Sequence, residues 1–421
     1  MEKPKLFVTF KSFWLTLFFL LSILVIHLSY IYKNYNEFKI KPLFYTDVEV
    51  IQAYEKWKTD NFYTIIKVYS SQLDIIFFSR TKIRVDELTP HLRLKIFPDS
   101  EMSFYSYLGT SYINSSVNEI YKEESFKSKV MALVEMQHQD VKIANFYNAI
   151  YFAQPLDKEL RQEVALLGVS HLIALSGFHL AILWTLLFST LRFFYRIFQE
   201  RYFPYRFDLI DVGFLVLILL AWYVWFVDAP PSLLRSYMMM VMGWILLILG
   251  VELVSLSFLT IMVLILLVIF PKLLLSLGFW FSVTGVFYIF LLLHYFKDVN
   301  RYWLMIIISF GIFILMLPIV HMVFSLTSFL QLASPFLSLL FTPFYPLTIG
   351  LHIIGLGDIF DELLIKLFSL KSMHKEIFLS YWIGGVYLFL SILSFYFKKL
   401  FYLILLLSIL YFIGLFIGLL L

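Results

Sequence analysis

The sequence predicts a polytopic α-helical membrane protein of about nine spans, with interrupted or re-entrant helices and a small all-β, OB-like soluble domain. Hydrophobic residues make up 61% of the 421 residues and charged residues only 15%, and the mean hydropathy is +0.84. A soluble chain of this length needs more charge than that. Apolar runs long enough to cross a bilayer recur after residue 165. Between residues 33 and 112 apolar and polar residues alternate instead, as in half-buried strands.

Residues 1–32 are predicted to form a transmembrane signal anchor. The stretch has a basic start, then an apolar run of roughly 20 residues that is long enough to span a bilayer. It lacks the small-residue cleavage site of a removable signal peptide. Lys3, Lys5 and Lys11 favour a cytoplasmic N-terminus, because basic residues stay on that side of the membrane.

Residues 33–112 are predicted to form an extracytoplasmic, OB-like β domain. Four segments have the composition and alternation of strands: 44–52, 62–70, 73–79 and 92–97. Clusters of Pro, Asp, Ser and Asn separate them. About five short strands in so short a segment suggest a small barrel, of which the OB-fold is one candidate.

Three basic residues of this domain, Arg80, Lys82 and Arg84, occupy alternate positions. Alternate residues of a strand point to the same face, so the three are expected on one face of one strand. Two interpretations stay open. The stripe is either a solvated edge strand or a surface that contacts a polyanion.

Residues 113–165 are predicted to form amphipathic helices at the membrane interface, and residues 166–421 to form a polytopic domain. Eight apolar spans are expected in it, at 177–198, 209–227, 232–250, 254–270, 274–296, 303–324, 377–396 and 401–421.

Three basic loops orient these spans. RFFYRIFQERYFPYR, HYFKDVNR and FKK all fall on the cytoplasmic side if the β domain lies outside. Residues 325–376 then lie on the outer side, so their apolar, proline-broken stretch is expected to be re-entrant or an interrupted helix. The alternative is that this stretch spans the membrane once.

The stretch LGVSHLIALSGFHLAIL places His171, Ser176 and His179 in an apolar segment. On one continuous helix these side chains point in all directions, at about 100° per residue, and could not face a single pore. We therefore expect the helix to break near Ser176 and Gly177, as discontinuous membrane helices do at binding sites. The alternative is that each histidine binds a backbone carbonyl and only ties helices together.

A second constellation is VDAPPSLLRSYMMM. Asp228 is expected to cap a helix that has Pro230 and Pro231 in its first turn. Arg235 follows two turns later, roughly 10 Å along the axis from Asp228 and too far for a direct ion pair. Arg235 either snorkels to the membrane surface or binds an anion such as a phosphate near the helix N-terminus.

These two constellations closely resemble a known family. QEVALLGVSHLIALSGFHLAIL is similar to the signature of the ComEC/Rec2 competence family, a Gly-x-Ser-His-Leu followed by a Ser-Gly-x-His. The similarity extends to PLDKELR, DAPPSLLRSYMMM, LLSLGFWFSVTGVFYIFLL and LASPFLSLLFTPFYPLTIG, and covers about residues 125–355. Phe178 and the Ser282-Val283 pair depart from the common family residues, both conservatively.

The resemblance implies a channel of the bacterial inner membrane that admits single-stranded DNA during natural transformation, with an OB-like domain on the outer side. The implied pathway residues are His171, Ser176, Gly177, His179, Asp228, Pro230, Pro231 and Arg235. Arg80, Lys82 and Arg84 are possible DNA contacts of the outer domain. The expected partners are single-stranded DNA, the lipid bilayer, an extracytoplasmic DNA receptor, and a cytoplasmic motor or single-strand-binding protein.

Several absences in the sequence shape this expectation. Long family members carry a metallo-β-lactamase-like domain, but this sequence has no His-x-His-x-Asp-His motif, so a separate nuclease is a possible partner. No Gly-x-x-x-x-Gly-Lys loop is present, so ATP-driven pulling would come from a partner. There is no cysteine, which excludes disulfides and thiolate chemistry. We expect no catalytic residue, no cofactor and no metal.

Two other functions are weighed against the channel. An intramembrane, rhomboid-like serine hydrolase would use Ser176 and His179, which are close in sequence. However, such enzymes have Gly-x-Ser-Gly where this chain has Ala-Leu-Ser-Gly, and their histidine comes from another helix. A transporter of a small solute is the third hypothesis, and an internal inverted repeat, which we do not find, would favour it.

Overall fold

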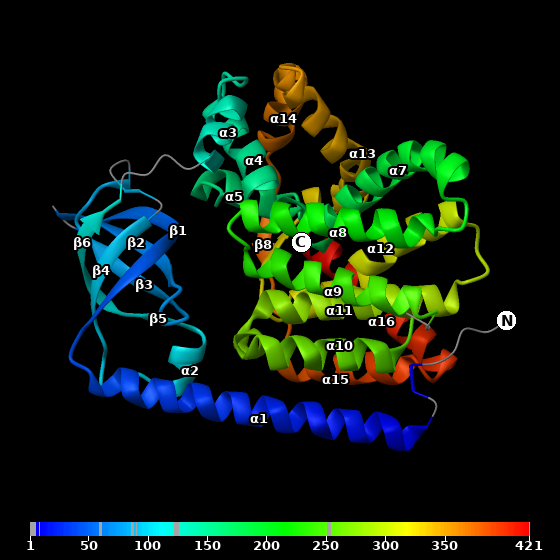
Figure 1. Cartoon of the computed structure of the whole chain (residues 1–421), viewed down its shortest axis with the longest axis horizontal. Helices are drawn as coiled ribbons and strands as arrows, with labels where there is room; N and C mark the ends of the chain where they lie inside the picture. Colours follow the sequence, from blue (N-terminus) through cyan, green and yellow to red (C-terminus); the bar gives the residue numbers. More distant parts are fainter. Residues whose placement is uncertain are drawn as a thin grey trace. The chain divides into compact units, whose positions relative to one another are not determined.

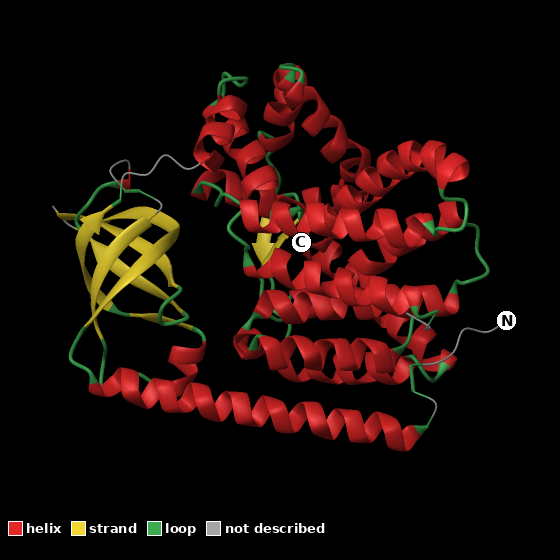
Figure 2. Ribbon diagram, viewed as in Figure 1, coloured by secondary structure: helices red, strands yellow, loops and turns green. Residues whose placement is uncertain are grey.

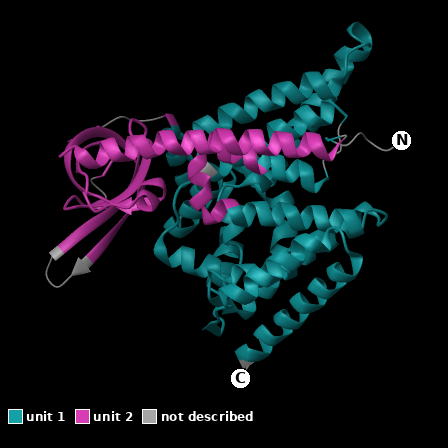
Figure 3. Cartoon of the chain, turned by 90° about the horizontal axis from the view of Figure 1, so that it is seen from below, with its two compact units in different colours: residues 1–8, 127–262, 280–421 teal, residues 9–126, 263–279 magenta. Residues whose placement is uncertain are grey.

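The computed structural model describes residues 6–7, 9–58, 61–85, 88–89, 91–121, 126–250 and 254–420. The chain divides into two compact units, which Figure 3 shows in different colours. One unit comprises residues 9–126 and 263–279, and the other residues 1–8, 127–262 and 280–421. Most of the strands lie in the first unit and most of the helices in the second (Figure 2).

The first unit begins with a helix, α1 (Phe10–Ile40), that is long enough and apolar enough to cross a membrane. Thr9 caps it by accepting a hydrogen bond from the backbone of Ser12 at 3.2 Å. The helix continues well past residue 32, so the predicted end of the anchor is wrong. The extension forms because Tyr35 and Phe38 of its last turns are buried in the core of the β domain.

The sheet of this unit confirms the four predicted strands. These are β1 (Phe44–Lys58), β2 (Asn61–Ser70), β3 (Ile75–Thr81) and β4 (His91–Phe97). A short helix, α2 (Phe104–Leu108), leads to β5 (Thr110–Tyr112) and β6 (Asn114–Ile120). The strand order is β5-β3-β2-β1-β4-β6. Alternate residues such as Ile66, Phe77 and Leu94 point inward and are fully buried, as the alternation predicts.

The sheet closes on itself. Only Ile113 separates β5 from β6; β5 pairs in parallel with β3, and β6 pairs antiparallel with β4. The hydroxyls of Ser79 on β3 and Ser115 on β6 lie 2.7 Å apart across the closure. Residues 113–120 were expected to belong to the interfacial helices, and this boundary is wrong, because the free edge of β4 supplies hydrogen-bond partners that a local pattern does not reveal.

The second unit is helical. It opens with three short helices in the region expected to be amphipathic: α3 (Phe126–Glu135), α4 (Val141–Phe152) and α5 (Lys158–Leu166). The eight predicted spans after residue 165 all coincide with helices (Figure 1). They are α7 (Gly177–Tyr202), α8 (Asp208–Phe226), α9 (Pro231–Ile248), α10 (Leu256–Ile269), α11 (Leu277–Tyr295), α12 (Arg301–Val320), α15 (Tyr381–Ser394) and α16 (Lys398–Leu420).

Within the described residues, seven helices are long and apolar enough to cross a membrane, and three more apolar helices are shorter. The seven include α13 (Ser334–Ile353), in the proline-broken stretch that was expected to be re-entrant or interrupted. The helix is continuous through Pro343 and Pro346, so the alternative, a single span, fits its length. Membrane helices tolerate proline where neighbouring groups satisfy the freed carbonyls.

Short elements complete this unit. The four-residue helix α6 (Ser170–Ile173) precedes α7. A 3-10 turn, η4 (Gly357–Phe360), joins α13 to α14 (Asp361–Phe368). Two short strands, β7 (Leu326–Ser328) and β8 (His374–Glu376), pair with each other. Side chains of α4, α5, α13 and α14 form the largest of the buried cores in the described chain.

Candidate functional site

The predicted break in the His-Ser-Gly stretch is confirmed. The helix α6 ends at Ile173, Ala174 is extended, and α7 starts at Gly177 with Ser176 as its N-cap. The Ser176 hydroxyl accepts a hydrogen bond from the Phe178 backbone at 3.3 Å. The Ser176 N–H donates to His179 Nδ1 at 3.3 Å, which completes a reciprocal capping arrangement. Polar side chains that could not share one face of a continuous helix therefore stabilise the start of a new one.

Serines from two neighbouring helices hold the broken segment. Ser334 of α13 donates to the Gly168 carbonyl at 3.0 Å, and the Ser338 hydroxyl lies 3.4 Å from His171 Nε2. From α9, Ser232 donates to the Leu175 carbonyl at 2.8 Å. Non-helical backbone in an apolar region must find such partners, because no bulk water is there to supply them.

Gly177 allows α9 to approach the break closely. A Cβ atom at this position would lie 3.1 Å from Ser236 Oγ and 3.2 Å from Ser236 Cβ. These separations are shorter than normal carbon contacts. A larger residue here would therefore require Ser236 of α9 to move by a few tenths of an ångström.

The two histidines of the stretch have different surroundings. His171 is exposed, whereas His179 is completely buried. The His179 ring meets Phe341 and Tyr345 of α13 edge to face, at centroid distances of 5.2 and 4.9 Å. Thus His171 lies at the surface of the helical unit, and His179 is a buried part of the framework.

The second constellation meets the first through α9, but Asp228 does not cap that helix. The N-cap is Pro230 and the first helical residue is Pro231, so no side-chain oxygen occupies the cap position. Asp228 instead forms an ion pair with Lys127 at 2.6 Å. Asp228 and Ala229 have φ values of 63° and 45°, in the left-handed region. This turn directs the carboxylate away from the helix start, and the capping prediction is wrong.

Arg235 lies on the part of α9 that contacts the break. It follows Ser232 by about one turn and directly precedes Ser236. Its side chain is enclosed by protein, with 6% of the residue exposed. A snorkelling arginine would extend toward water, so the burial does not support that interpretation. The structure therefore places a guanidinium in the same apolar unit as the interrupted helix.

The basic residues predicted in the β domain do not share one strand. Arg80 is exposed on β3, but that strand ends at Thr81, and Lys82 and Arg84 follow it in a loop. The one-strand prediction is wrong for these two residues, because alternation continues in the sequence after the sheet pairing has stopped. The Arg80 guanidinium lies over the Tyr63 ring at 5.7 Å and that of Arg84 over Phe62 at 5.7 Å.

A larger set of paired cations and rings was not predicted from the sequence. Lys67 lies over Phe78 at 5.7 Å. Lys95 lies over both Tyr45, at 5.8 Å, and Phe97, at 5.4 Å. Partial burial lowers the pKa of Lys67 from its usual value. The period-2 pattern could have identified the outward positions, but the pairing across strands requires the register.

The comparisons with known proteins identify one family. The family model described as "Competence protein" matches residues 153–421. This range covers the interrupted helix together with α9 and α13. No curated protein and no solved structure matches the chain significantly. Among the described residues, no group of three or more histidine and acidic side chains is arranged to hold a metal ion.

Proposed function

The chain belongs to the competence protein family, a family of DNA uptake, and from this premise we propose that it conducts single-stranded DNA through the bacterial cytoplasmic membrane during natural transformation. Its apolar helices support a multi-pass membrane protein. The strand would cross in the helical unit, and the other unit would receive it on the outer side.

One observation carries the proposal: an apolar helical unit contains an interrupted helix whose Gly168 and Leu175 carbonyls and His171 imidazole are contacted by serines. A nucleic-acid strand carries about one negative charge per nucleotide, so its path needs polar or cationic lining rather than hydrocarbon. The break provides exposed His171, and the adjoining helix carries Arg235. We propose that Ser176, Gly177 and His179 shape this path, and that Asp228, Pro230 and Pro231 fix the start of α9.

The basic loops support an orientation with the N-terminus in the cytoplasm and the β domain outside. In that orientation an extracytoplasmic receptor would deliver DNA to the β domain. A cytoplasmic motor or single-strand-binding protein would draw the strand inward. Such a partner would supply the energy, since the sequence carries no phosphate-binding Gly-Lys loop.

The β domain has features that suit single-stranded DNA. Its strand pairing, in which the consecutive strands β5 and β6 pair with β3 and β4, supports our proposal of an OB-like barrel. Its outward face carries cations over aromatic rings at Arg80 and Tyr63 and at Lys95 and Phe97. Bases stack on such rings while cations neutralise phosphates. We propose that this face, with Lys82 and Arg84 beside it, contacts the incoming strand.

Uptake of labelled DNA into the cytoplasm tests the channel. We expect His179→Ala and Arg235→Gln to abolish cytoplasmic accumulation while DNA still binds outside, at normal membrane levels of the protein. His374→Ala and Arg301→Gln are matched controls, because both residues are exposed. The controls should accumulate DNA as the wild type does. Normal uptake by both site variants would contradict the proposal.

The β-domain face is tested by binding of a fluorescent single-stranded oligonucleotide to the full chain in detergent micelles. Arg80→Ala combined with Tyr63→Ala should weaken binding about tenfold or more, because each stacked base contributes about 1–3 kcal/mol. Arg201→Ala with Tyr202→Ala is the matched control, a similar pair in the helical unit at 5.6 Å. Equal losses in both double variants would argue against a specific surface.

One observation favours a second function, an intramembrane serine hydrolase: the Ser176 hydroxyl lies 3.3 Å from His179 Nδ1. A serine nucleophile must donate its proton to the histidine. Here the Ser176 N–H already donates to that nitrogen, and the hydroxyl accepts from Phe178. The geometry thus suits a helix cap better than a nucleophile.

A further inference from the structure

A chain of polar side chains in the helical unit lies outside the site described above. It joins the turn after α3 to α13 and α14. His138 Nδ1 is 3.0 Å from both carboxylate oxygens of Asp361. His138 Nε2 is 3.0 Å from His352 Nε2, and His352 Nδ1 is 2.7 Å from the Thr348 carbonyl. The chain therefore runs from a carboxylate through two imidazoles to a carbonyl.

These three contacts determine how many protons the chain holds. Each contact needs one proton between its two heavy atoms. The Thr348 carbonyl only accepts, so His352 Nδ1 must carry a proton, and a second lies between His138 and Asp361. With no more than these two, both Nε2 atoms would present lone pairs to each other at 3.0 Å. A third proton is therefore required, whereas a carboxylate and two neutral imidazoles carry only two.

The charge of the group is balanced when it holds three protons. Asp361 supplies one negative charge and the extra proton supplies one positive charge, so the chain is neutral as a whole. A fourth proton would place two N–H groups face to face and leave a net positive charge. The His138 side chain is completely buried and that of Asp361 is 14% exposed. Burial favours the neutral arrangement, because uncompensated charge is costly there.

Neighbouring residues fix the distance between the two rings. The Gln137 side chain donates to the His352 carbonyl at 3.1 Å and accepts from the Gly357 backbone at 3.0 Å. A Cβ atom at Gly357 would lie 2.7 Å from His352 Nε2. On the other side, Tyr147 stacks on His138 at a centroid distance of 4.6 Å. The two imidazole rings are therefore enclosed by Gln137, Gly357 and Tyr147, and they cannot separate unless these neighbours move.

The other titratable groups around the chain leave this charge balance intact. From α4, Tyr147 and Tyr151 face the rings, and the Tyr151 hydroxyl is 3.3 Å from His352 Nδ1. Burial raises the pKa of both phenols, so neither carries charge near neutral pH. Glu135 of α3 binds the side chain of Asn148 at 2.7 Å. The nearby charged side chains of η4 and α14 are exposed; they are Asp358, Glu362 and Lys366.

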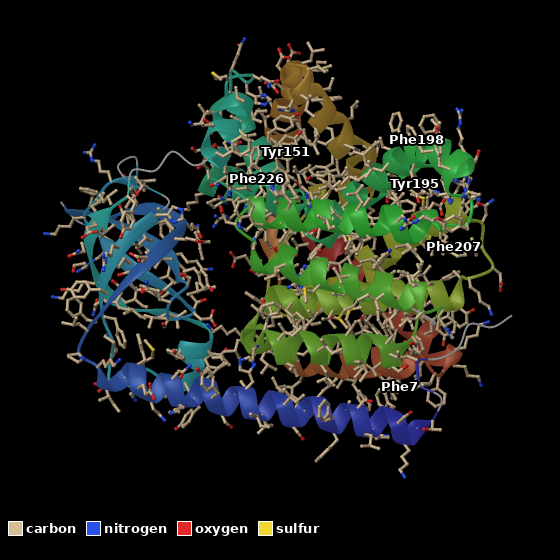
Figure 4. The ribbon with its side chains drawn as sticks, in the orientation of Figure 1. Phe7, Tyr151, Tyr195, Phe198, Phe207 and Phe226 are labelled. Atoms are coloured by element: carbon tan, nitrogen blue, oxygen red, sulfur yellow. The ribbon has the colours of Figure 1, made fainter. Side chains whose placement is uncertain are left out.

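We propose that Asp361, His138 and His352 form a proton-binding site that holds one proton more than a carboxylate and two neutral imidazoles would carry. The shared proton links the turn that follows α3 to the junction of α13, η4 and α14. The site is also close to the interrupted helix. The ring centroids of Tyr151 (Figure 4) and Tyr345 are 5.9 Å apart, and those of Tyr345 and His179 are 4.9 Å apart.

Thermal unfolding of the full chain in detergent micelles, measured from about pH 5 to pH 9, tests the site. In this proposal the folded chain binds one proton more at this site than the unfolded chain does. Stability should therefore fall as the pH rises. His138→Gln and His352→Gln, whose amides do not titrate, should lose this part of the pH dependence. The exposed His374, changed to Gln, is the matched control and should keep it.

A third variant decides the question even if the glutamine variants fold poorly. In Asp361→Asn the amide oxygen can still accept from His138, but the shared proton becomes an uncompensated positive charge. It should leave at lower pH, so the fall in melting temperature should move to lower pH than in the wild type. An unchanged transition in Asp361→Asn, or wild-type pH dependence in His138→Gln and His352→Gln, would overturn the proposal.

Discussion

At the residue scale, Ser176 and His179 show how a pair of polar residues in hydrocarbon can be structural. The serine caps α7, and the histidine accepts the serine N–H. An N-cap side chain contributes about 1 kcal/mol to helix stability. The pair thus defines where the new helix begins, and the path that we propose depends on that position.

Substitutions that keep or remove the cap separate this role from catalysis. Ser176→Ala should lower the free energy of unfolding by about 1 kcal/mol, because the Phe178 N–H loses its acceptor. Ser176→Asn and His179→Gln should retain stability and DNA uptake, since both side chains can make the capping hydrogen bonds. Thermal unfolding and an uptake assay give the two readouts. Loss of uptake in a stable Ser176→Asn variant would show that the hydroxyl itself, and not the helix cap, is required.

Gly177 is the position where side-chain volume matters most directly. Gly177→Ala should destabilise the protein and reduce uptake, because the new methyl group would press on Ser236 of α9. Gly243→Ala on α9 is the matched control, since no neighbouring atom lies within 4 Å of where its methyl group would stand. We expect the control to be neutral or slightly stabilising. Equal melting temperatures for the two variants would show that the close approach is unimportant.

Sequence reasoning at this scale succeeded where the chemistry is local. The break at Ser176 follows from polar residues that no single helix face accommodates, and the structure has it. The prediction that Asp228 caps α9 failed because Asp228 and Ala229 adopt a left-handed conformation. Non-glycine residues rarely adopt it, so the sequence does not indicate it. The His138, His352 and Asp361 cluster was missed because its members lie far apart in sequence.

At the element scale, hydropathy located the long helices well, but not every boundary. The eight spans expected after residue 165 are helices, because apolar length alone identifies them. The stretch that forms α13 was expected to be re-entrant or interrupted, because proline inside a helix usually kinks or breaks it. The extension of α1 and the strand β6 depend on contacts with the barrel, which lie outside any sequence window.

The end of α4 offers a test of local backbone strain. Its C-cap, Ala153, has φ 60° and ψ 26°, a left-handed conformation that glycine adopts more readily. Ala153→Gly should therefore stabilise the protein by about 1 kcal/mol. Ala149→Gly, at a buried position inside the same helix, should destabilise it by a similar amount or more. Chemical denaturation of both variants checks the contrast, and a destabilised Ala153→Gly would count against the assigned backbone.

At the scale of the whole molecule, the two units have different chemistry. One carries a closed barrel with cations paired to rings, and the other an apolar helical body with a polar interruption. Composition and alternation predicted a β segment followed by apolar helices, but not that residues 263–279 would group with the β segment. The family match covers only residues 153–421. The role that we propose for the barrel is therefore inferred from its surface residues alone.

We propose that this chain itself forms the path for a single DNA strand. The most direct measurement reconstitutes the purified protein in liposomes and follows labelled single-stranded DNA into the lumen, with a nuclease outside to remove unimported strands. We predict nuclease-protected single strands in wild-type liposomes, little protection of duplex DNA, and none of either with Arg235→Gln. Wild-type liposomes that protect no more single-stranded DNA than protein-free ones, even when a gradient or an internal single-strand-binding protein favours import, would contradict the account.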